Sequence, residues 1–292
     1  MKQKNVGRFF TAPVIITLAL LALVILASIF APLVAPYNPE ALDMAAKLQM
    51  PTAAHLLGTD NVGRDILSRL IFGSRITLLS ALAVVVISVI IGIPLGLVSG
   101  YYGGRLDNLI MRVEDVVLAF PALLLAFLFV ASFGKSITSA IIALGIVYVP
   151  MISRLTRSLT LMERGKPYVE SARSIGFSDR RILFRHILPN CVSTITTQLT
   201  LDIGSAILDL AALSFLGMGV QPPTSDWGAM LEEGHAYIQS DPMLCIAPGC
   251  AIILTVVLFN LLSDNIQMYL DPFQRKLPPF KKLKKMAGGL VE

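Results

Sequence analysis

The sequence predicts an all-α integral membrane protein with six transmembrane helices and both termini in the cytoplasm. Of its 292 residues, 55% are hydrophobic and only 15% are charged, whereas a soluble domain usually has about 25% charged residues. The mean hydropathy is +0.73. Because so few charges cannot cover a globular surface in water, lipid is the expected solvent. Charge-free apolar runs give the number of helices, and the positions of Lys and Arg give the orientation.

Six apolar runs are long enough to cross a membrane, which takes about 20 residues in a helix. They lie between Arg8 and Glu40, Arg75 and Arg105, Asp115 and Lys135, Lys135 and Arg154, residues 192 and 216, and Asp241 and Asp264. Acids interrupt the fifth run. The first run is longer than the apolar core of a signal peptide, and no clear small-x-small cleavage site follows it. We therefore expect an uncleaved anchor.

Lys and Arg are distributed unevenly between these runs. With the N-terminus inside, the cytoplasmic segments hold nineteen of the 24 Lys and Arg residues and the extracytoplasmic segments hold five. Cytoplasmic loops of membrane proteins carry such an excess of positive charge. The last extracytoplasmic loop is acidic instead, with Asp226, Glu232, Glu233 and Asp241. Both termini are therefore expected in the cytoplasm.

The runs divide the chain into three parts. Residues 1–70 form an N-terminal anchor helix and an extracytoplasmic loop, residues 71–272 form the transmembrane core, and residues 273–292 form a basic cytoplasmic tail. Lysines in the tail would attract anionic headgroups of the membrane lipid. We expect them to fix the topology rather than to bind one particular lipid. Because basic residues do not gather on one patch, nothing indicates a nucleic-acid partner.

Residue patterns for catalysis or metal binding are missing from the sequence. It has no H-E-x-x-H, no phosphate-binding glycine loop and no G-x-S-x-G. No histidine lies in an apolar run to activate Ser205, and the three histidines have no helical i, i+3 or i, i+4 pairing. They are His55, His186 and His235. The cysteines are interpreted as packing residues. We expect no catalytic residue, no metal site and no cofactor in this chain.

The longest cytoplasmic segment, about residues 157–190, has helical patterning of its own. Tyr168, Ala172 and Ile175 recur at helical spacing, and Gly176 suits a left-handed helix C-cap. The polar residues on the other faces of this helix are Glu170, Arg173 and Ser174.

A second short helix is expected over Asp179–His186, capped by Ser178 and ended by Pro189. Its apolar residues would pack on the bundle, namely Ile182, Leu183 and Leu188. Two short helices joined by a glycine form a rigid knob, which can transmit a displacement between a partner protein and the membrane helices. The alternative is a generic pair of interfacial helices.

Asp202 and Asp209 lie seven residues apart in the fifth run, about two helical turns, and so share one face of a helix. An acid inside a span is costly and usually faces a cavity or a partner. One interpretation is that both acids line a pathway and attract a peptide amino group or a metal cation. The other is that they pair with a donor on a neighbouring helix or lie near the lipid headgroups.

The knob resembles the EAA loop in the membrane subunits of ABC importers, whose pattern is E-A-A-x-x-x-G, nine residues, then I-x-L-P. The chain has Glu170-Ser171-Ala172, Gly176 and, at the matching distance, Leu188-Pro189. Ser171 replaces an alanine and His186 replaces the isoleucine, and both changes are compatible with a helix. The resemblance implies a coupling helix that contacts an ATPase through Tyr168, Glu170, Ser171, Ala172, Arg173 and Gly176.

Other segments are similar to one branch of that family, the C-type permease subunits of dipeptide, oligopeptide and nickel importers. They are His55–Arg69, Tyr101–Gly104, Leu213–Gly219, residues 221–223, Trp227–Gly228 and Asp271–Pro272. The resemblance implies a type I ABC importer permease fold for the core of residues 71–272, with its coupling loop at about 157–190. It also implies a bacterial or archaeal cell (inner) membrane.

The resemblance implies partners as well. A second, B-type permease would complete the pathway, two ATPase subunits carrying ATP and Mg would dock at the knobs, and an extracytoplasmic binding protein would deliver the substrate. Short peptides are the favoured substrate, with nickel or a nickel chelate as the alternative. A secondary transporter is the alternative class, although the chain has no visible duplicated half.

The segment Gly58–Arg69 has two interpretations. Asp60 can cap a short helix that starts near Val62, with Asp65 and Arg69 as an i, i+4 ion pair, which describes an interfacial helix on the outer surface. The alternative is contact with the partner permease or the binding protein. The candidate contact residues are Asp60, Arg64, Asp65 and Trp227.

Overall fold

The computed structural model describes residues 12–270, and every regular element within them is helical. This confirms the all-α prediction for that part of the chain. The helices are α2 (Ala12–Ile29), α3 (Ala31–Val34), α4 (Ile66–Tyr102), α5 (Gly104–Leu118), α6 (Ala122–Phe133), α7 (Ile137–Arg164), α8 (Pro167–Ser174), α9 (Asp179–Ile182), α10 (Leu188–Phe215), α11 (Trp227–His235) and α12 (Met243–Leu270). A 3-10 turn covers Met44–Ala46 and a π turn covers Leu183–Ile187.

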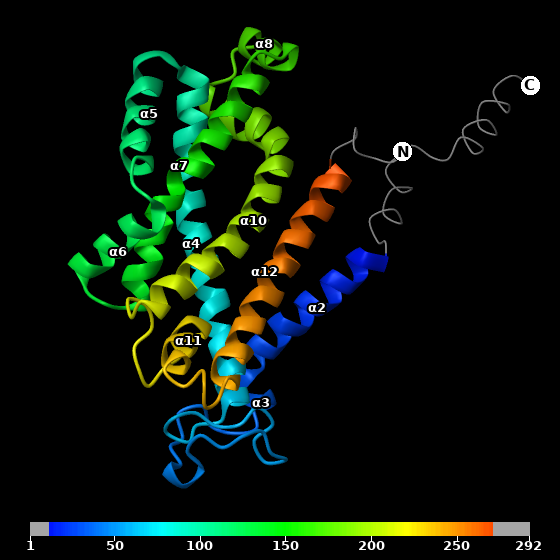
Figure 1. Cartoon of the computed structure of the whole chain (residues 1–292). Helices are drawn as coiled ribbons and strands as arrows, with labels where there is room; N and C mark the ends of the chain where they lie inside the picture. The colour runs from blue at the N-terminus through cyan, green and yellow to red at the C-terminus, as the bar shows by residue number, and fades with distance from the viewer. Residues whose placement is uncertain (1–11, 271–292) are drawn as a thin grey trace, which may run out of the picture.

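The long helices form an elongated bundle with two different ends (Figure 1). Helix α4 runs along α7, and α10 packs against α12, α4 and α7. Helix α2 lies beside α12. One end of the bundle carries α8, and the opposite end carries α3 with the irregular segment of residues 36–65. The basic residues near the N-terminus and in the C-terminal tail lie outside the described residues.

Within residues 12–270, four helices are long and apolar enough to cross a membrane. They are α4, α7, α12 and the continuous helix Asp179–Phe215 that contains α9 and α10. The bent pair of α5 and α6 would make a fifth span, and α2 is a shorter apolar helix at the edge of the described range. The count of six spans therefore stays a prediction.

The sequence had led us to expect one helix over the third apolar run, but the structure does not form one there. The run is divided between α5 and α6, whose axes are bent by 84°. Pro121 starts the second helix, and a proline lacks the N–H needed to continue a helix and disfavours helical backbone in the residue before it. Arg157 in α7 fixes α5 by a bidentate pair with Asp107, with both N–O distances 2.6 Å.

Two other helix boundaries differ from the predictions. No separate interfacial helix starts near Val62, because α4 itself begins at Ile66 and runs for 37 residues. Pro189 does not end the helix of the knob. The π turn before it shifts the backbone bonding, with Leu188 N–H donating to Leu183 C=O, so Pro189 falls in the first turn of α10, where its missing N–H is tolerated.

Three glycines let α4 approach α7 closely. Gly92, Gly96 and Gly100 are four residues apart, and a Cβ at each would meet the α7 backbone or the Cβ of a side chain. At Gly96 the added Cβ would lie 2.6 Å from Thr156 Cβ, and at Gly100 it would lie 2.7 Å from Thr160 Cβ. In lipid, where apolar surface alone does not drive association, such small-residue spacing lets helices gain van der Waals contact.

We expect Gly96→Ala to destabilise the protein by about 1–3 kcal/mol, the usual cost of overpacking a tight interior. Thermal unfolding in detergent measures this. Gly249→Ala is the matched control, because it lies inside α12 and its Cβ would be 3.9 Å from Leu231 Cδ2, an ordinary contact. Equal melting temperatures for the two variants would contradict the assigned role of Gly96.

Candidate functional site

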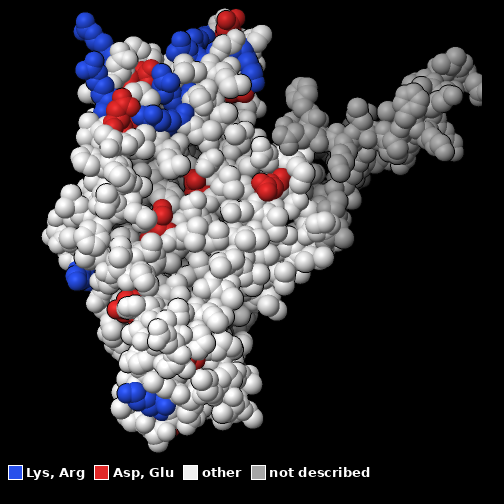
Figure 2. Space-filling model, viewed as in Figure 1, with Lys and Arg blue, Asp and Glu red and all other residues white. Residues whose placement is uncertain are grey.

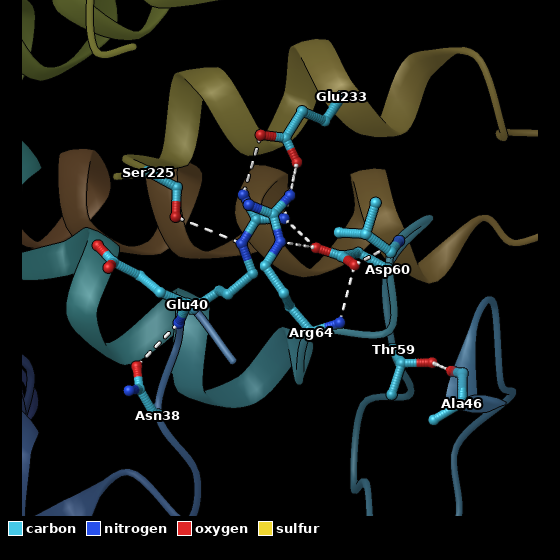
Figure 3. A network of polar contacts seen from close by, with 10 residues as sticks. Asn38, Glu40, Ala46, Thr59, Asp60, Arg64, Ser225 and Glu233 are labelled. Carbon is cyan, nitrogen blue, oxygen red and sulfur yellow. Dashed lines mark hydrogen bonds and ion pairs between the residues drawn. The ribbon is translucent and has the colours of Figure 1, made fainter. Parts of the chain in front are cut away.

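A buried ionic cluster joins residues 36–65 to α11 at the α3 end of the bundle (Figure 3). This Asp60 cluster consists of Asp60, Arg64, Arg69 and Glu233. Asp60 Oδ2 accepts from Arg64 Nε at 2.6 Å and from Arg69 Nη1 at 2.5 Å. Glu233 accepts from Arg64 Nη2 at 2.8 Å and from Arg69 Nη1 and Nη2 at 2.7 and 3.0 Å. Two buried cations thus meet the buried carboxylate of Asp60 and the partly buried carboxylate of Glu233.

Asp65 is the N-cap of α4 and not the ion-pair partner of Arg69. Its carboxylate accepts from the backbone N–H and hydroxyl of Ser68 at 2.8 and 2.7 Å, and it lies 2.9 Å from His55 Nδ1. The predicted Asp65–Arg69 pair is therefore wrong. A capping carboxylate must turn back to the first-turn amides, which leaves Arg69 to Asp60 and Glu233.

The N-cap residue Asp226 and the first residue Trp227 hold α11 against α10 and α4. Asp226 caps it, accepting from Ala229 N–H at 2.7 Å and from the Ser214 hydroxyl at 2.8 Å. Burial raises the pKa of Asp226, and these hydrogen bonds oppose the rise. The Trp227 indole donates to Leu70 C=O at 3.0 Å.

The four residues expected to contact a partner at this end are buried within the chain. Asp60, Arg64, Asp65 and Trp227 are between 1% and 7% exposed. In this structure their side chains therefore support the surface loop from inside the protein and do not form its exposed face. The exposed apolar side chains of the adjoining loop are instead Leu42, Met44, Met50 and Leu56.

At the opposite end, α8 and α9 form the predicted knob. Gly176 has a φ of +85°, the left-handed conformation expected of a C-cap glycine. Phe177 N–H donates to Ala172 C=O at 3.1 Å and Gly176 N–H donates to Arg173 C=O at 2.8 Å, which together form a Schellman motif. Ser178 occupies the N-cap position of α9, although its side chain makes no capping bond.

The buried face of the knob includes Val169 and leaves out Ile175, which the sequence had grouped with Tyr168 and Ala172 by helical spacing. Val169 and Ala172 are buried, Tyr168 is half-buried, and Ile175 is 71% exposed. The Schellman turn reverses the chain after Ser174, so Ile175 leaves the face that continues through Val169 and Ala172. The knob residues pack on Leu97, Tyr101, Cys191 and Ile195 from α4 and α10.

Tyr101, the penultimate residue of α4, holds the knob to the bundle. Its hydroxyl donates to Asp179 Oδ1 at 2.7 Å and accepts from Arg173 Nε at 3.3 Å. The Arg173 guanidinium also lies 5.0 Å from the centroid of the Tyr101 ring, within cation–π range. Arg164 at the end of α7 donates to the Tyr101 carbonyl at 2.7 Å. The ends of α4 and α7 and both knob helices therefore meet at one tyrosine.

The other predicted coupling residues divide into anchored and exposed groups. Tyr168 donates to Glu163 Oε2 at 2.6 Å and accepts from Asn190 Nδ2 at 3.1 Å. Burial and the bond to Glu163 raise the pKa of Tyr168 to about 12. Glu170 and Ser171 are exposed. The knob therefore presents polar groups and Ile175 outward, while Tyr168 and Ala172 face inward.

The two acids of the fifth run have different surroundings. Asp202 is 2% exposed, and its Oδ1 accepts from Gln198 Nε2 at 2.8 Å. Asp209 is half-buried, accepts from the Tyr148 hydroxyl at 2.7 Å, and lines a groove of about 350 Å³. Asp202 does not line that groove. Both acids pair with neutral donors, and Asp209 alone of the two reaches the groove.

Three residues of these sites were missed by sequence reasoning: Glu233, Tyr101 and Tyr148. Glu233 was counted only as part of an acidic loop, and Tyr101 only as part of a matching segment. An acid inside a span calls for a donor, but its identity depends on helix packing. No group of three or more His, Cys, Asp and Glu side chains in residues 12–270 is arranged to hold a metal ion.

Comparison with known families and sequences gives a consistent result. The family model described as "Binding-protein-dependent transport system inner membrane component" matches residues 92–276. The probable D,D-dipeptide transport system permease protein DdpC of Escherichia coli is 43% identical over 262 residues, covering 89% of this chain and 88% of that protein. The glutathione transport system permease protein GsiD of Pectobacterium atrosepticum is 43% identical over 267 residues, covering 91% and 89%.

The fold also resembles a solved transporter. The inward-facing MetNI methionine ABC transporter aligns with a TM-score of 0.57 at 17% identity, covering 69% of this chain and 96% of that chain. At this identity the likeness establishes the fold alone.

We expect Arg69→Ala to cost about 3–5 kcal/mol, because it leaves buried carboxylates short of one cation. Thermal unfolding in detergent is the measurement. Arg75→Ala is the control, since Arg75 is an exposed residue of the same helix, and exposed substitutions usually stay within about 0.5 kcal/mol. A loss in Arg69→Ala no larger than in Arg75→Ala would refute the structural role of the cluster.

Gly176→Val should distort the end of α8, because a left-handed residue with a branched side chain costs about 1–2 kcal/mol. No atom lies within 4 Å of a Cβ built at Gly176, so the cost comes from the backbone. Gly165→Val is the control, with equally open space and a φ of −82°. We expect faster proteolysis within residues 165–190 in the first variant only. Equal proteolysis rates would mean that the left-handed cap does not hold the knob.

Proposed function

Because the chain belongs to the family of binding-protein-dependent transport system inner membrane components, we propose that it is the permease subunit of an ATP-driven importer of dipeptides or short oligopeptides. It is an integral inner-membrane protein and a permease rather than an enzyme. The relatives in dipeptide and glutathione transport systems support a peptide substrate. The observation that carries the proposal is their identity of over 40% along nearly the whole chain.

In the proposed topology the chain crosses the membrane six times, with both termini in the cytoplasm. The spans are α2, α4, the α5–α6 pair, α7, the α9–α10 helix and α12. An even number of crossings leaves both termini on one side. Lys and Arg gather at the α8 end, above a largely uncharged middle (Figure 2), which supports the cytoplasmic assignment of that end.

At the cytoplasmic end, the knob would receive an ATPase subunit that binds ATP and Mg. Exposed Glu170, Ser171 and Ile175 supply a mixed polar and apolar contact. Arg173 and Tyr168 then act within the chain, fixing the knob to α4 and α10 through Tyr101 and Asn190. A knob fixed at both helices moves with them, so a displacement made by the ATPase reaches the spans. Two such ATPases and a B-type permease complete the proposed complex.

At the extracytoplasmic end, the Asp60 cluster would hold residues 36–65 as a platform for the binding protein. Its buried ion pairs fix the loop against α11. The exposed apolar side chains of the loop, between 57% and 69% exposed, suit a docking partner: Leu42, Met44, Met50 and Leu56. In this proposal Asp60, Arg64, Asp65 and Trp227 contribute to docking by positioning, without direct contact.

The test is transport by the whole complex in proteoliposomes. The chain is purified with its partner permease and two ATPases, and the binding protein is loaded with dialanine or with nickel. We expect ATP-dependent uptake of dialanine and stimulation of ATP hydrolysis by the dialanine-loaded binding protein. Uptake of nickel without uptake of peptide would overturn the substrate assignment. Uptake that needs an ion gradient instead of ATP would overturn the permease assignment.

A further inference from the structure

The groove beside Asp209 has the composition of a small-molecule site. Ligand sites are clefts of roughly 300–1,000 Å³, mostly apolar with a few converging polar groups, and this groove measures about 350 Å³. Phe120 at the α5–α6 corner, Met151 of α7 and Leu208 of α10 supply apolar lining. Tyr148 and Asp209 supply the polar side. Three separate elements therefore converge on a volume that suits a dipeptide.

Asp209 is the one charged residue among the side chains that line this groove. Its hydrogen-bond partner is the neutral Tyr148 hydroxyl, and no ion pair within residues 12–270 compensates its charge. A half-buried carboxylate in a membrane-spanning helix is costly unless a cation or water meets it. The Tyr148 bond fixes the direction of the carboxylate and leaves its charge to be balanced from the groove.

The chemistry of the groove favours an ammonium group over a metal ion. A metal needs several anionic or imidazole ligands, and no such group of side chains exists within residues 12–270. An ammonium group offers three N–H donors, which one carboxylate, the nearby Ser205 hydroxyl and water can accept. The adjoining apolar lining suits a small side chain on the same molecule.

We propose that Asp209, oriented by Tyr148, binds the free amino terminus of the transported peptide, with a peptide side chain against Met151 and Leu208. This inference rests on the proposed function, peptide import. It makes Asp209 a substrate-contacting residue and Tyr148 a positioning residue.

The first experiment measures maximal dialanine uptake by the reconstituted complex at saturating loaded binding protein. Asp209→Asn should lower uptake about tenfold or more, the range expected for a lost hydrogen bond to a charged group. Stimulation of ATP hydrolysis by the loaded binding protein should persist. Tyr148→Phe keeps the Asp209 carboxylate but removes the hydrogen bond that orients it. The loss of dialanine uptake should therefore be smaller than in Asp209→Asn. Asp202→Asn is the matched control on the same helix and should keep the wild-type uptake rate.

A second measurement detects occupancy directly. Ser205→Cys is introduced in a background where the more accessible native thiols Cys245 and Cys250 are serine, and a cationic thiol reagent labels it during turnover. Cys191 is 1% exposed and can stay. We expect transported dialanine to slow the labelling of the introduced cysteine. N-acetyl-dialanine at equal concentration should give no protection.

The outcomes of these experiments distinguish a failure of the amino-terminus site from a failure of the proposed peptide import. Wild-type uptake by Asp209→Asn, or equal protection by the acetylated peptide, would overturn the amino-terminus site while leaving peptide import intact. Labelling of Ser205→Cys in the isolated chain but not in the assembled complex would also overturn it, because the partner permease would then cover the groove. Failure of the wild-type complex to import any dipeptide would instead refute the proposed function.

Discussion

The close contact between α4 and α7 is the constraint on which the other sites depend. Glycines at 92, 96 and 100 let the two helices approach closely, because a Cβ at each of these positions would lie within 3.0 Å of an atom of α7. Helix α4 then runs uninterrupted for 37 residues, with Arg69 in the Asp60 cluster at one end and Tyr101 in the knob at the other. Because α7 ends at the same tyrosine through Arg164, the two ends of the molecule are joined by one packed pair of helices.

Polar side chains are used differently along this pair. At each end they are paired within the chain, as with Arg69 and Glu233 or Tyr101 and Asp179. Such pairs contribute geometry more than net stability, since desolvation offsets much of the attraction. Farther along the bundle, Asp202 and Asp209 each have a neutral partner, and Asp209 alone of the two lines the open groove. A carboxylate without an ion pair beside an open groove therefore distinguishes the candidate binding site from the paired charges at the two ends.

The sequence predicted the features that depend on residues close together in the chain. The apolar runs located α4, α7, α10 and α12, and Gly176 adopts the left-handed cap expected of it. Long-range pairing could not be predicted in this way. Arg69 was assigned to Asp65, four residues away, whereas Glu233, 164 residues away, takes it, since helix packing decides which side chains meet. The effect of a proline also depends on its context. Pro121 starts a new helix after a bend, whereas the π turn lets Pro189 sit in the first turn of α10.

The Asp60 cluster also has a consequence for how the chain is made. Ribosomes synthesise Arg64 and Arg69 long before Glu233, so at first Asp60 is the only carboxylate of the cluster that is present. Until α11 is made, the two guanidinium groups therefore share the single carboxylate of Asp60. Glu233 of α11 supplies the second carboxylate of the cluster. The cluster is therefore complete only after the last third of the chain has been made and α11 has packed beside Arg64 and Arg69.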